Sequence, residues 1–398
     1  MTNRALKVIP TTPRHITSHP NVQGLRHNPF MTSYRAVSIF EHDTELGNRF
    51  KDRSLVTSSG FEQLEKIAER VNRDEPILLN MGDSSTSGWN GEVIHGNLTD
   101  LSCALFTYRT YSDLLEESFP GNVINAGVPG YTSHQGGKYL KILLCRLQQL
   151  GIKPDFITLY FGNNDSTYGI EDKCKIDLEQ VSRFSDVLRV TPQDYRLNLQ
   201  EMIRTIRELG AVPILIVPVV NYVHEPYIRS RKYKGESLNM FNSLTDRVLK
   251  SRLKKAHDLW SYGNYRAACE LDIALPRISR AHLQALHKVA SETETVIINV
   301  QDKIAINRPN EADNFFIDYC HPNEDTNRFI GDRIAAIVRS GEQGTLFEQL
   351  ASQDHGSDES GLPIGTRAFF YLLRLGSNLL PSSLVRRDGD ATNNIYPT

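Results

Sequence analysis

The sequence lacks three features that would place it in a common class: a cysteine pattern, an excess of one charge and a long apolar run. Its five cysteines are odd in number and form no CxxC pair, which predicts reduced thiols without a metal cluster. Lys and Arg number 45 and Asp and Glu number 47, so the charge favours neither nucleic acid nor an anionic membrane as a partner. No segment reaches the roughly 20 apolar residues that a helix needs to span a bilayer.

Targeting and cofactor motifs are also missing. The N-terminal residues hold no apolar run of the secretory type, and together with the missing membrane span this predicts a cytoplasmic protein. No HExxH motif offers paired metal-ligating histidines. The phrase GDSSTSG at 82–88 lacks the Lys of a phosphate-binding P-loop. We therefore expect no metal and no organic cofactor.

The sequence does contain an alternation of apolar runs with helical patterns. The segments between the runs repeat apolar residues every three or four positions, and two of them stop at Gly151 and Gly210. Strands separated by helices pair in parallel through right-handed crossovers, which predicts an α/β fold with a doubly wound sheet and helices on both faces. The expected strands are 77–81, 122–127, 156–162, 212–220 and 295–300.

The remaining segments predict additions to this α/β domain. We place the domain at 76–221 and 293–340, an N-terminal extension at 1–75, a helical insertion at 222–292, and a C-terminal linker and tail at 341–398. Gly263, Tyr265 and Ala268 in the insertion resemble the small-residue packing of a tetratricopeptide helix pair, and the alternative is a lid on the main domain. The insertion and the tail are the segments that could contact a protein or a membrane surface.

Polar phrases at the expected strand ends hold the residue types of a serine hydrolase. Ser84, in the phrase MGDSS, is the candidate nucleophile. Asp318 lies three residues before His321 in the phrase DYCHPN, so one loop could carry both the acid and the base that activate a serine. Taken singly, each phrase is also an ordinary turn or helix cap. Their occurrence together favours catalysis at the carboxyl edge of the sheet.

Two further phrases offer donors for an oxyanion hole. In NAGVPGY, either Gly127 or Gly130 could bring a bare backbone N–H close to a reacting carbonyl. In FGNND, the side-chain amide of Asn163 or Asn164 could donate as well. The N–H of Ser84 would complete a hole of three donors.

The four phrases GDS, NAGVPG, GNND and DYCHPN resemble, in order, the signature blocks of the GDSL-type esterases and lipases, also called SGNH hydrolases. The resemblance implies a flavodoxin-like three-layer α/β/α sandwich around a parallel sheet. It also implies that Ser84 is the nucleophile, that Asp318 and His321 complete the triad, and that Gly130 and Asn164 join Ser84 in the oxyanion hole. The sequence departs from the family pattern at Ser85, where leucine is usual.

The predicted function is therefore a serine ester hydrolase that forms an acyl-enzyme on a small acylated substrate such as a carbohydrate, a metabolite or a short-chain ester. The alternatives are an acyltransferase that uses the same triad and a binding scaffold without turnover. Activity should rise with pH as His321 loses its proton, near a pKa of about 6.5. Tyr131, Tyr168 and Trp89 lie beside the signature phrases and could line the acyl pocket.

Overall fold

The protein was analysed as a computed structural model of the whole chain. It describes residues 40–50, 53–57, 60–88, 93–95, 105–106, 109–167, 188–226, 245–273, 275–304, 306 and 309–341. The chain divides into two units, 1–335 and 336–398, and of the second only residues 336–341 are described. Trp89, Tyr168 and residues 342–398 of the predicted tail lie outside the described residues.

A seven-stranded sheet forms the centre of the first unit, in the order β11-β10-β9-β5-β8-β3-β4. Five neighbouring strands of this sheet, from β11 to β8, pair in parallel, which confirms the predicted parallel sheet. Numbered from β5 as the first of them, the parallel strands follow the order 2-1-3-4-5 of a flavodoxin-like fold, whose topological switch point lies between β5 and β9. These strands are β5 (Ile77–Gly82), β8 (Asn122–Gly127), β9 (Phe156–Tyr160), β10 (Val212–Ile216) and β11 (Val296–Ile298).

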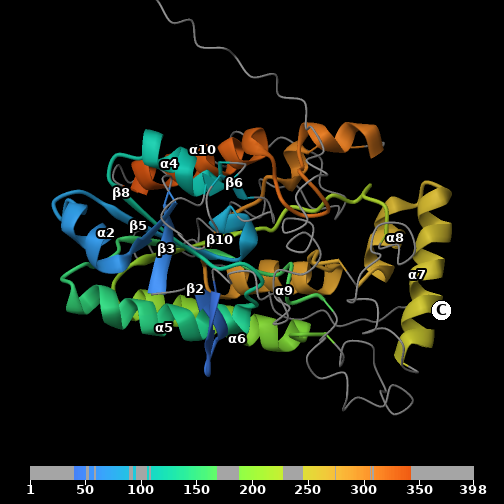
Figure 1. Cartoon of the computed structure of the whole chain (residues 1–398), viewed down its shortest axis with the longest axis horizontal. Coiled ribbons are helices and arrows are strands. Elements are labelled where there is room, and N and C mark those ends of the chain that lie inside the picture. The colour runs from blue at the N-terminus through green and yellow to red at the C-terminus, as the bar shows by residue number, and fades with distance from the viewer. Residues whose placement is uncertain are drawn as a thin grey trace, which may run out of the picture. The chain divides into compact units, whose positions relative to one another are not determined.

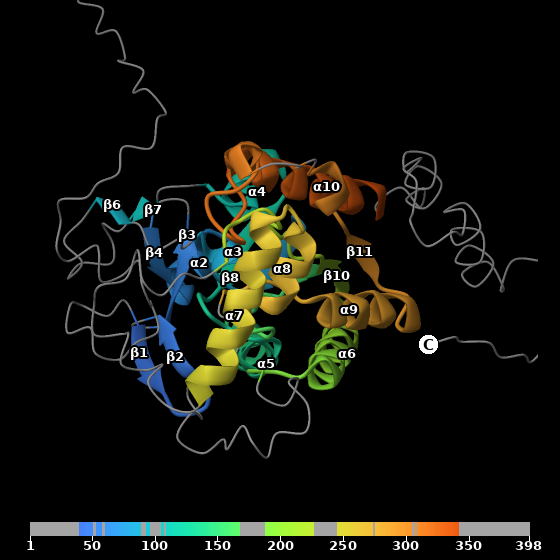
Figure 2. The same ribbon diagram turned by 90° about the vertical axis from the view of Figure 1, so that its right-hand side faces the viewer.

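Helices cover both faces of this sheet, as Figures 1 and 2 show from two sides. One layer holds α4 (Tyr111–Ser118) and residues 324–335 of α10 (Glu324–Gly341), and the other holds α5 (Ser133–Gln149), α6 (Pro192–Glu208) and α9 (Arg280–Glu292). Gly151 and Gly210 follow α5 and α6 with φ angles of 70° and 82°, a conformation that glycine adopts readily, so the predicted helix ends are confirmed.

The N-terminal extension contributes to the sheet. Within it lie β3 (Ser54–Thr57), β4 (Gly60–Gln63) and α2 (Leu64–Arg70). β3 pairs antiparallel with β8 through Val56 and Asn125, and β4 pairs antiparallel with β3. The α/β domain therefore begins before its predicted start at residue 76. Two hairpins lie apart from the sheet: β1 (Phe40–Asp43) with β2 (Gly47–Phe50), and β6 (Val93–His95) with β7 (Leu105–Phe106).

The helices of the predicted insertion pack in two different places. In its described residues α7 (Thr245–Ser261) and α8 (Tyr265–Leu271) pack against each other, and no strand occurs there. The indole Nε1 of Trp260 donates to the carbonyl of Val223 at 2.8 Å, which ties α7 to the segment after β10. α9 instead packs on α6 and leads into β11. The insertion thus ends before α9, which belongs to the α/β layers.

Short helices complete the described fold: α3 (Ser84–Ser87) and the 3-10 helices η5 (Gln301–Lys303) and η6 (Pro309–Asn314). Among the described helices, none combines the length and the apolar character needed to cross a membrane.

Candidate active site

Ser84 is the first residue of α3, directly beyond β5. A Cβ at Gly82 would lie 2.0 Å from Oγ1 of Thr86 and 2.9 Å from the carbonyl oxygen of Tyr160, so only glycine allows this close turn. Asp83 caps the helix, because its Oδ1 accepts from the N–H of Ser85 at 2.9 Å. The turn therefore places the Ser84 hydroxyl at the switch point of the sheet, where α/β proteins bind their ligands.

Two hydrogen bonds join the predicted nucleophile, base and acid. Nε2 of His321 lies 2.7 Å from Oγ of Ser84, and Nδ1 of His321 lies 2.7 Å from Oδ2 of Asp318. An ionised carboxylate can only accept, so Nδ1 carries the proton and Nε2 accepts from the serine hydroxyl. The structure thus brings together three residues that the sequence separates by up to 237 positions.

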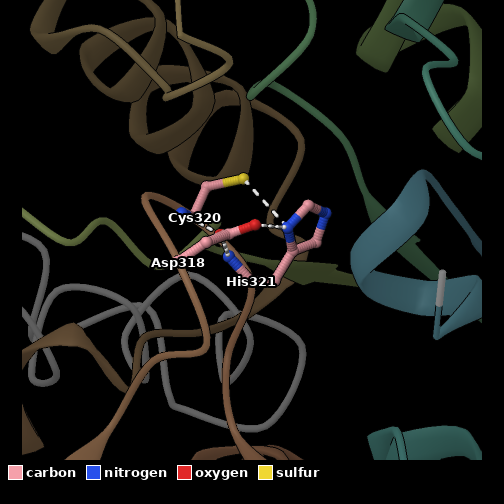
Figure 3. A group of neighbouring side chains, drawn as sticks. All are labelled: Asp318, Cys320 and His321. Atoms are coloured by element: carbon pink, nitrogen blue, oxygen red, sulfur yellow. Dashed lines mark hydrogen bonds and ion pairs between the residues drawn. The ribbon is translucent and has the colours of Figure 1, made fainter. Parts of the chain in front are cut away.

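A compact turn lets one loop supply both Asp318 and His321. Oδ1 of Asp318 accepts from the backbone N–H groups of Cys320 and His321, each at 2.9 Å, which folds the carboxylate back over the loop. The side-chain amide of Asn221, beyond β10, donates to the carbonyl of Asp318 at 2.8 Å and fixes the loop from outside. In Figure 3 the Asp318 oxygen and the Cys320 sulfur both face Nδ1 of the imidazole.

The electrostatics of this pair favour a charged intermediate. Burial disfavours the imidazolium form, but the charge and hydrogen bond of Asp318 raise the pKa of His321 well above its ordinary value. Burial also opposes ionisation of Asp318, yet the His321 imidazole and the two backbone donors lower the pKa of the carboxyl. Asp318 is therefore ionised and can stabilise the positive charge that His321 gains when it takes a proton.

The geometry favours Gly130 over Gly127 as an oxyanion donor. The N–H of Gly127 already donates to Oδ1 of Asn125 at 3.0 Å, and a Cβ at Gly127 would lie 2.4 Å from the backbone nitrogen of Ser87. Because Gly127 has no side chain, α3 can pack closely on β8 at this position. Gly130 has a φ of 77°, and no described residue accepts a hydrogen bond from its N–H or from that of Ser84.

The two adjacent asparagines are also distinguished by their contacts. Nδ2 of Asn164 donates to Oδ2 of Asp83 at 3.1 Å, which fixes the orientation of the amide and leaves its second N–H for another acceptor. Burial raises the pKa of Asp83 to about 6, so this carboxyl is mostly ionised at neutral pH. Asn163 instead accepts from the N–H of Ile278 at 3.0 Å, and its Nδ2 is buried without a partner among the described residues.

Sequence reasoning missed the positioning contacts around the site. It assigned no role to Asp83 beyond its place before Ser84. It also overlooked Asp165, whose carboxylate accepts from the N–H and the hydroxyl of Ser133 at 2.9 and 2.6 Å and fixes the start of α5. A signal was present, since a carboxylate after a strand commonly binds the N–H groups of a nearby helix. Tyr131, a candidate pocket residue, is instead fully buried in the hydrophobic core.

A serine, a histidine and an aspartate linked by two hydrogen bonds at the switch point of a parallel sheet define a serine hydrolase on an α/β fold. A sequence profile of the GDSL-like lipase/acylhydrolase family matches residues 81–329, a range that contains every residue of this site. The chain belongs to that family, which confirms the resemblance seen in the four phrases and identifies a GDSL-type serine ester hydrolase.

Three solved structures resemble this chain at low sequence identity. LAE5, an α/β hydrolase enzyme from the metagenome of Lake Arreo in Spain, shares 17% identity with a TM-score of 0.36, over 67% of this chain and 95% of its own. A GDSL-like lipase from Bacteroides thetaiotaomicron VPI-5482 shares 12% identity with a TM-score of 0.38, over 69% and 95%. An acetyl xylan esterase from Geobacillus stearothermophilus shares 15% identity with a TM-score of 0.34, over 66% and 93%. No curated protein matches the chain.

Proposed function

We propose that this protein hydrolyses the ester of a small acylated molecule, such as a carbohydrate, a metabolite or a short-chain ester, through an acyl-enzyme on Ser84. The observation that carries the proposal is a pair of hydrogen bonds, each 2.7 Å long. One joins Ser84 Oγ to His321 Nε2, and the other joins His321 Nδ1 to Asp318 Oδ2. This is the arrangement that general-base activation of a serine requires.

In the first half-reaction, Oγ of Ser84 attacks the acyl carbonyl while His321 Nε2 takes the hydroxyl proton. The carbonyl oxygen becomes an oxyanion, which the N–H groups of Ser84 and Gly130 and the free N–H of Asn164 would stabilise. The imidazolium is held by Asp318, whose ionised form the local hydrogen bonds favour. Collapse of the tetrahedral intermediate breaks the ester bond, and His321 returns the proton to the leaving alcohol.

In the second half-reaction, water takes the place of the alcohol. His321, neutral again, accepts a proton from the attacking water, and the same oxyanion donors stabilise the second tetrahedral intermediate. Its collapse releases the acid and returns the proton to Ser84. The site's own side chains supply every proton transfer in this cycle.

The test is covalent labelling with a fluorophosphonate, which reacts only with an activated serine. We would treat the protein and its Ser84→Ala and His321→Ala variants, then measure intact mass and map the modified peptide. Ser85→Ala is a matched control, because Ser85 is the adjacent buried serine and its Oγ has no hydrogen-bond partner among the described residues.

The expected result is one adduct on Ser84 in the wild type and in Ser85→Ala, with none in Ser84→Ala and a strongly reduced rate in His321→Ala. Labelled protein should also lose its turnover of short-chain nitrophenyl esters. A folded wild type that neither labels nor turns over esters would contradict the proposal. An adduct on another serine would contradict the assigned nucleophile.

A further inference from the structure

Cys320 places a thiol against the side of His321 that does not face the nucleophile. Its Sγ lies 3.8 Å from Nδ1 of His321, the nitrogen that also faces Oδ2 of Asp318 (Figure 3). One ligand atom from each of the three side chains lies within 4.8 Å of the other two. A thiolate, an imidazole and a carboxylate are the ligand types that zinc prefers.

The separation of Sγ and Nδ1 is close to that of two ligands in a tetrahedral zinc site. Zinc–ligand distances of about 2.3 Å for sulfur and about 2.1 Å for nitrogen and oxygen imply ligand separations of about 3.6 Å for S···N and about 3.4 Å for N···O. The observed Sγ···Nδ1 distance of 3.8 Å needs almost no change. The Nδ1···Oδ2 distance of 2.7 Å must lengthen, because the ion replaces the shared proton.

We propose that Asp318, Cys320 and His321 form an inhibitory binding site for Zn²⁺ or a similar borderline-soft divalent cation. The three side chains would supply three ligands, and a water molecule would complete the tetrahedron. The side chain of Asp318 is 27% exposed, so the ion can reach the site from solvent along this side chain. Cys320 and His321 are buried. Cation binding needs only this geometry, whereas its inhibitory effect rests on the proposed esterase function.

Inhibition follows from the tautomer of the imidazole. A cation on Nδ1 requires that nitrogen to present its lone pair, so the remaining ring proton must sit on Nε2. Nε2 would then donate to Ser84 and could no longer accept the hydroxyl proton. Binding would switch off the base without occupying the acyl pocket, so the inhibition should not be competitive with substrate.

The binding step also has a defined proton balance. The ordinary pKa of a cysteine thiol is about 8.5, so a thiol at neutral pH still carries its proton. Coordination converts the thiol to a thiolate and releases its proton to solvent, while the imidazole proton moves from Nδ1 to Nε2 and stays on the ring. A site whose imidazole is neutral therefore releases one proton for each ion bound, and a site that starts as the imidazolium also releases the proton of Nδ1.

The experiment uses the full chain, freed of metal with a chelator and then titrated with ZnCl₂ or CoCl₂. We would measure ester turnover with zinc, and with cobalt the thiolate-to-metal charge-transfer absorption, which reports binding without any catalysis. Cys320→Ala removes the sulfur and keeps the backbone N–H that holds Asp318. Cys145→Ala is the matched control, because Cys145 is an exposed free thiol far along the chain.

We expect wild type and Cys145→Ala to lose turnover with zinc, to recover it with chelator, and to show the cobalt–thiolate band. Measured relative to its own turnover without zinc, Cys320→Ala should lack the band and need at least about 10- to 100-fold more zinc for half inhibition, the loss that even outer partners of a metal site typically cause. A wild type without the band, or a Cys320→Ala variant as zinc-sensitive as the wild type, would overturn the proposal. A band in a protein without esterase turnover would support the site and contradict the proposed function instead.

Discussion

At the scale of single residues, the proposed chemistry depends on how Asp318 fixes His321. The carboxylate accepts three hydrogen bonds, from two backbone N–H groups and from Nδ1 of the ring. It is therefore held in place before any substrate binds, and the ring is already in the tautomer that general-base catalysis needs. Such preorganisation avoids reorganisation during the reaction itself.

The raised pKa of His321 predicts the pH dependence of activity. The base acts only when neutral, and its pKa lies well above the ordinary value, so activity falls as pH drops through that raised pKa. We expect the acid limb of kcat/KM to lie above the pH of about 6.5 that an unperturbed histidine would give. The measurement is a pH profile of ester turnover.

The Asp318→Asn variant tests whether Asp318 is the cause of the raised pKa of His321. It removes the carboxylate that raises the pKa of His321, so the acid limb should move to lower pH while kcat falls by about 10⁴-fold. A wild-type limb at or below pH 6, or a limb that stays in place in Asp318→Asn, would show that Asp318 does not set the proton affinity of the base.

The contacts of Asn163 and Asn164 predict different losses in their alanine variants. Asn164→Ala should lower kcat by about 10²- to 10³-fold with little change in KM, because an oxyanion donor acts only in the transition state. Asn163→Ala should change kcat far less and should mainly destabilise the fold, since Asn163 holds the N–H of Ile278. Steady-state kinetics beside urea unfolding separate the two effects, and equal kcat losses would contradict the assignment.

The sequence could indicate which three side chains meet at the candidate site, because each follows a strand or lies in a short loop of recognisable composition. Ser84, His321 and Asp318 meet in the structure as expected. The choice between Gly127 and Gly130 could not be made from spacing, because it depends on which N–H is already bonded to Asn125. Likewise, the approach of Cys320 to the ring follows from the side-chain directions in a tight turn, which no sequence periodicity reports.

At the scale of elements, the loops beyond the strands are joined by buried contacts behind the site. Asp272, after α8, forms an ion pair with Arg277 at 2.7 Å, and both side chains are almost fully buried. The next residue, Ile278, donates its N–H to Asn163 and packs against the loop beyond β9. The ion pair thus fixes the segment that leads from the insertion to the active-site loops.

Breaking this ion pair should be costly. Asp272→Asn leaves the Arg277 charge buried without its partner, so we expect the free energy of unfolding to fall by about 3–5 kcal/mol. Glu208→Gln is the control, because it removes an exposed partner of Arg204 and should cost less than about 1 kcal/mol. Urea denaturation of both variants provides the comparison, and equal losses would mean that the buried pair contributes no more than a surface pair.

The sequence predicted the long elements and missed the short ones for a physical reason. Parallel strands buried on both faces read as continuous apolar runs, and the amphipathic helices between them have a clear period. β3 and β4 have only four residues each, and β3 joins β8 through a single pair of residues. Such strands are stabilised by the neighbours they meet in the fold, so local sequence gives little indication of them.

At the scale of the whole molecule, the strands of the N-terminal extension and the parallel strands share one hydrophobic core. Leu55 in β3 and Leu79 in β5 are both almost fully buried and belong to the same cluster of apolar side chains. A core that spans both segments should unfold as one unit. We therefore expect the predicted N-terminal extension to be as necessary to the stability of the α/β domain as the central strand.

A shared core predicts that a cavity in β3 and a cavity in β5 lower the free energy of unfolding by similar amounts. Leu55→Ala and Leu79→Ala should each lower the free energy of unfolding by about 2–5 kcal/mol, the usual cost of a cavity left by a buried leucine. Val212→Ala is the control, because Val212 is 43% exposed and should cost much less. In urea, circular dichroism and ester turnover should decline together in both leucine variants. If Leu55→Ala instead cost as little as Val212→Ala, or produced a separate early transition, β3 would be an appendage and the catalytic domain would begin at β5.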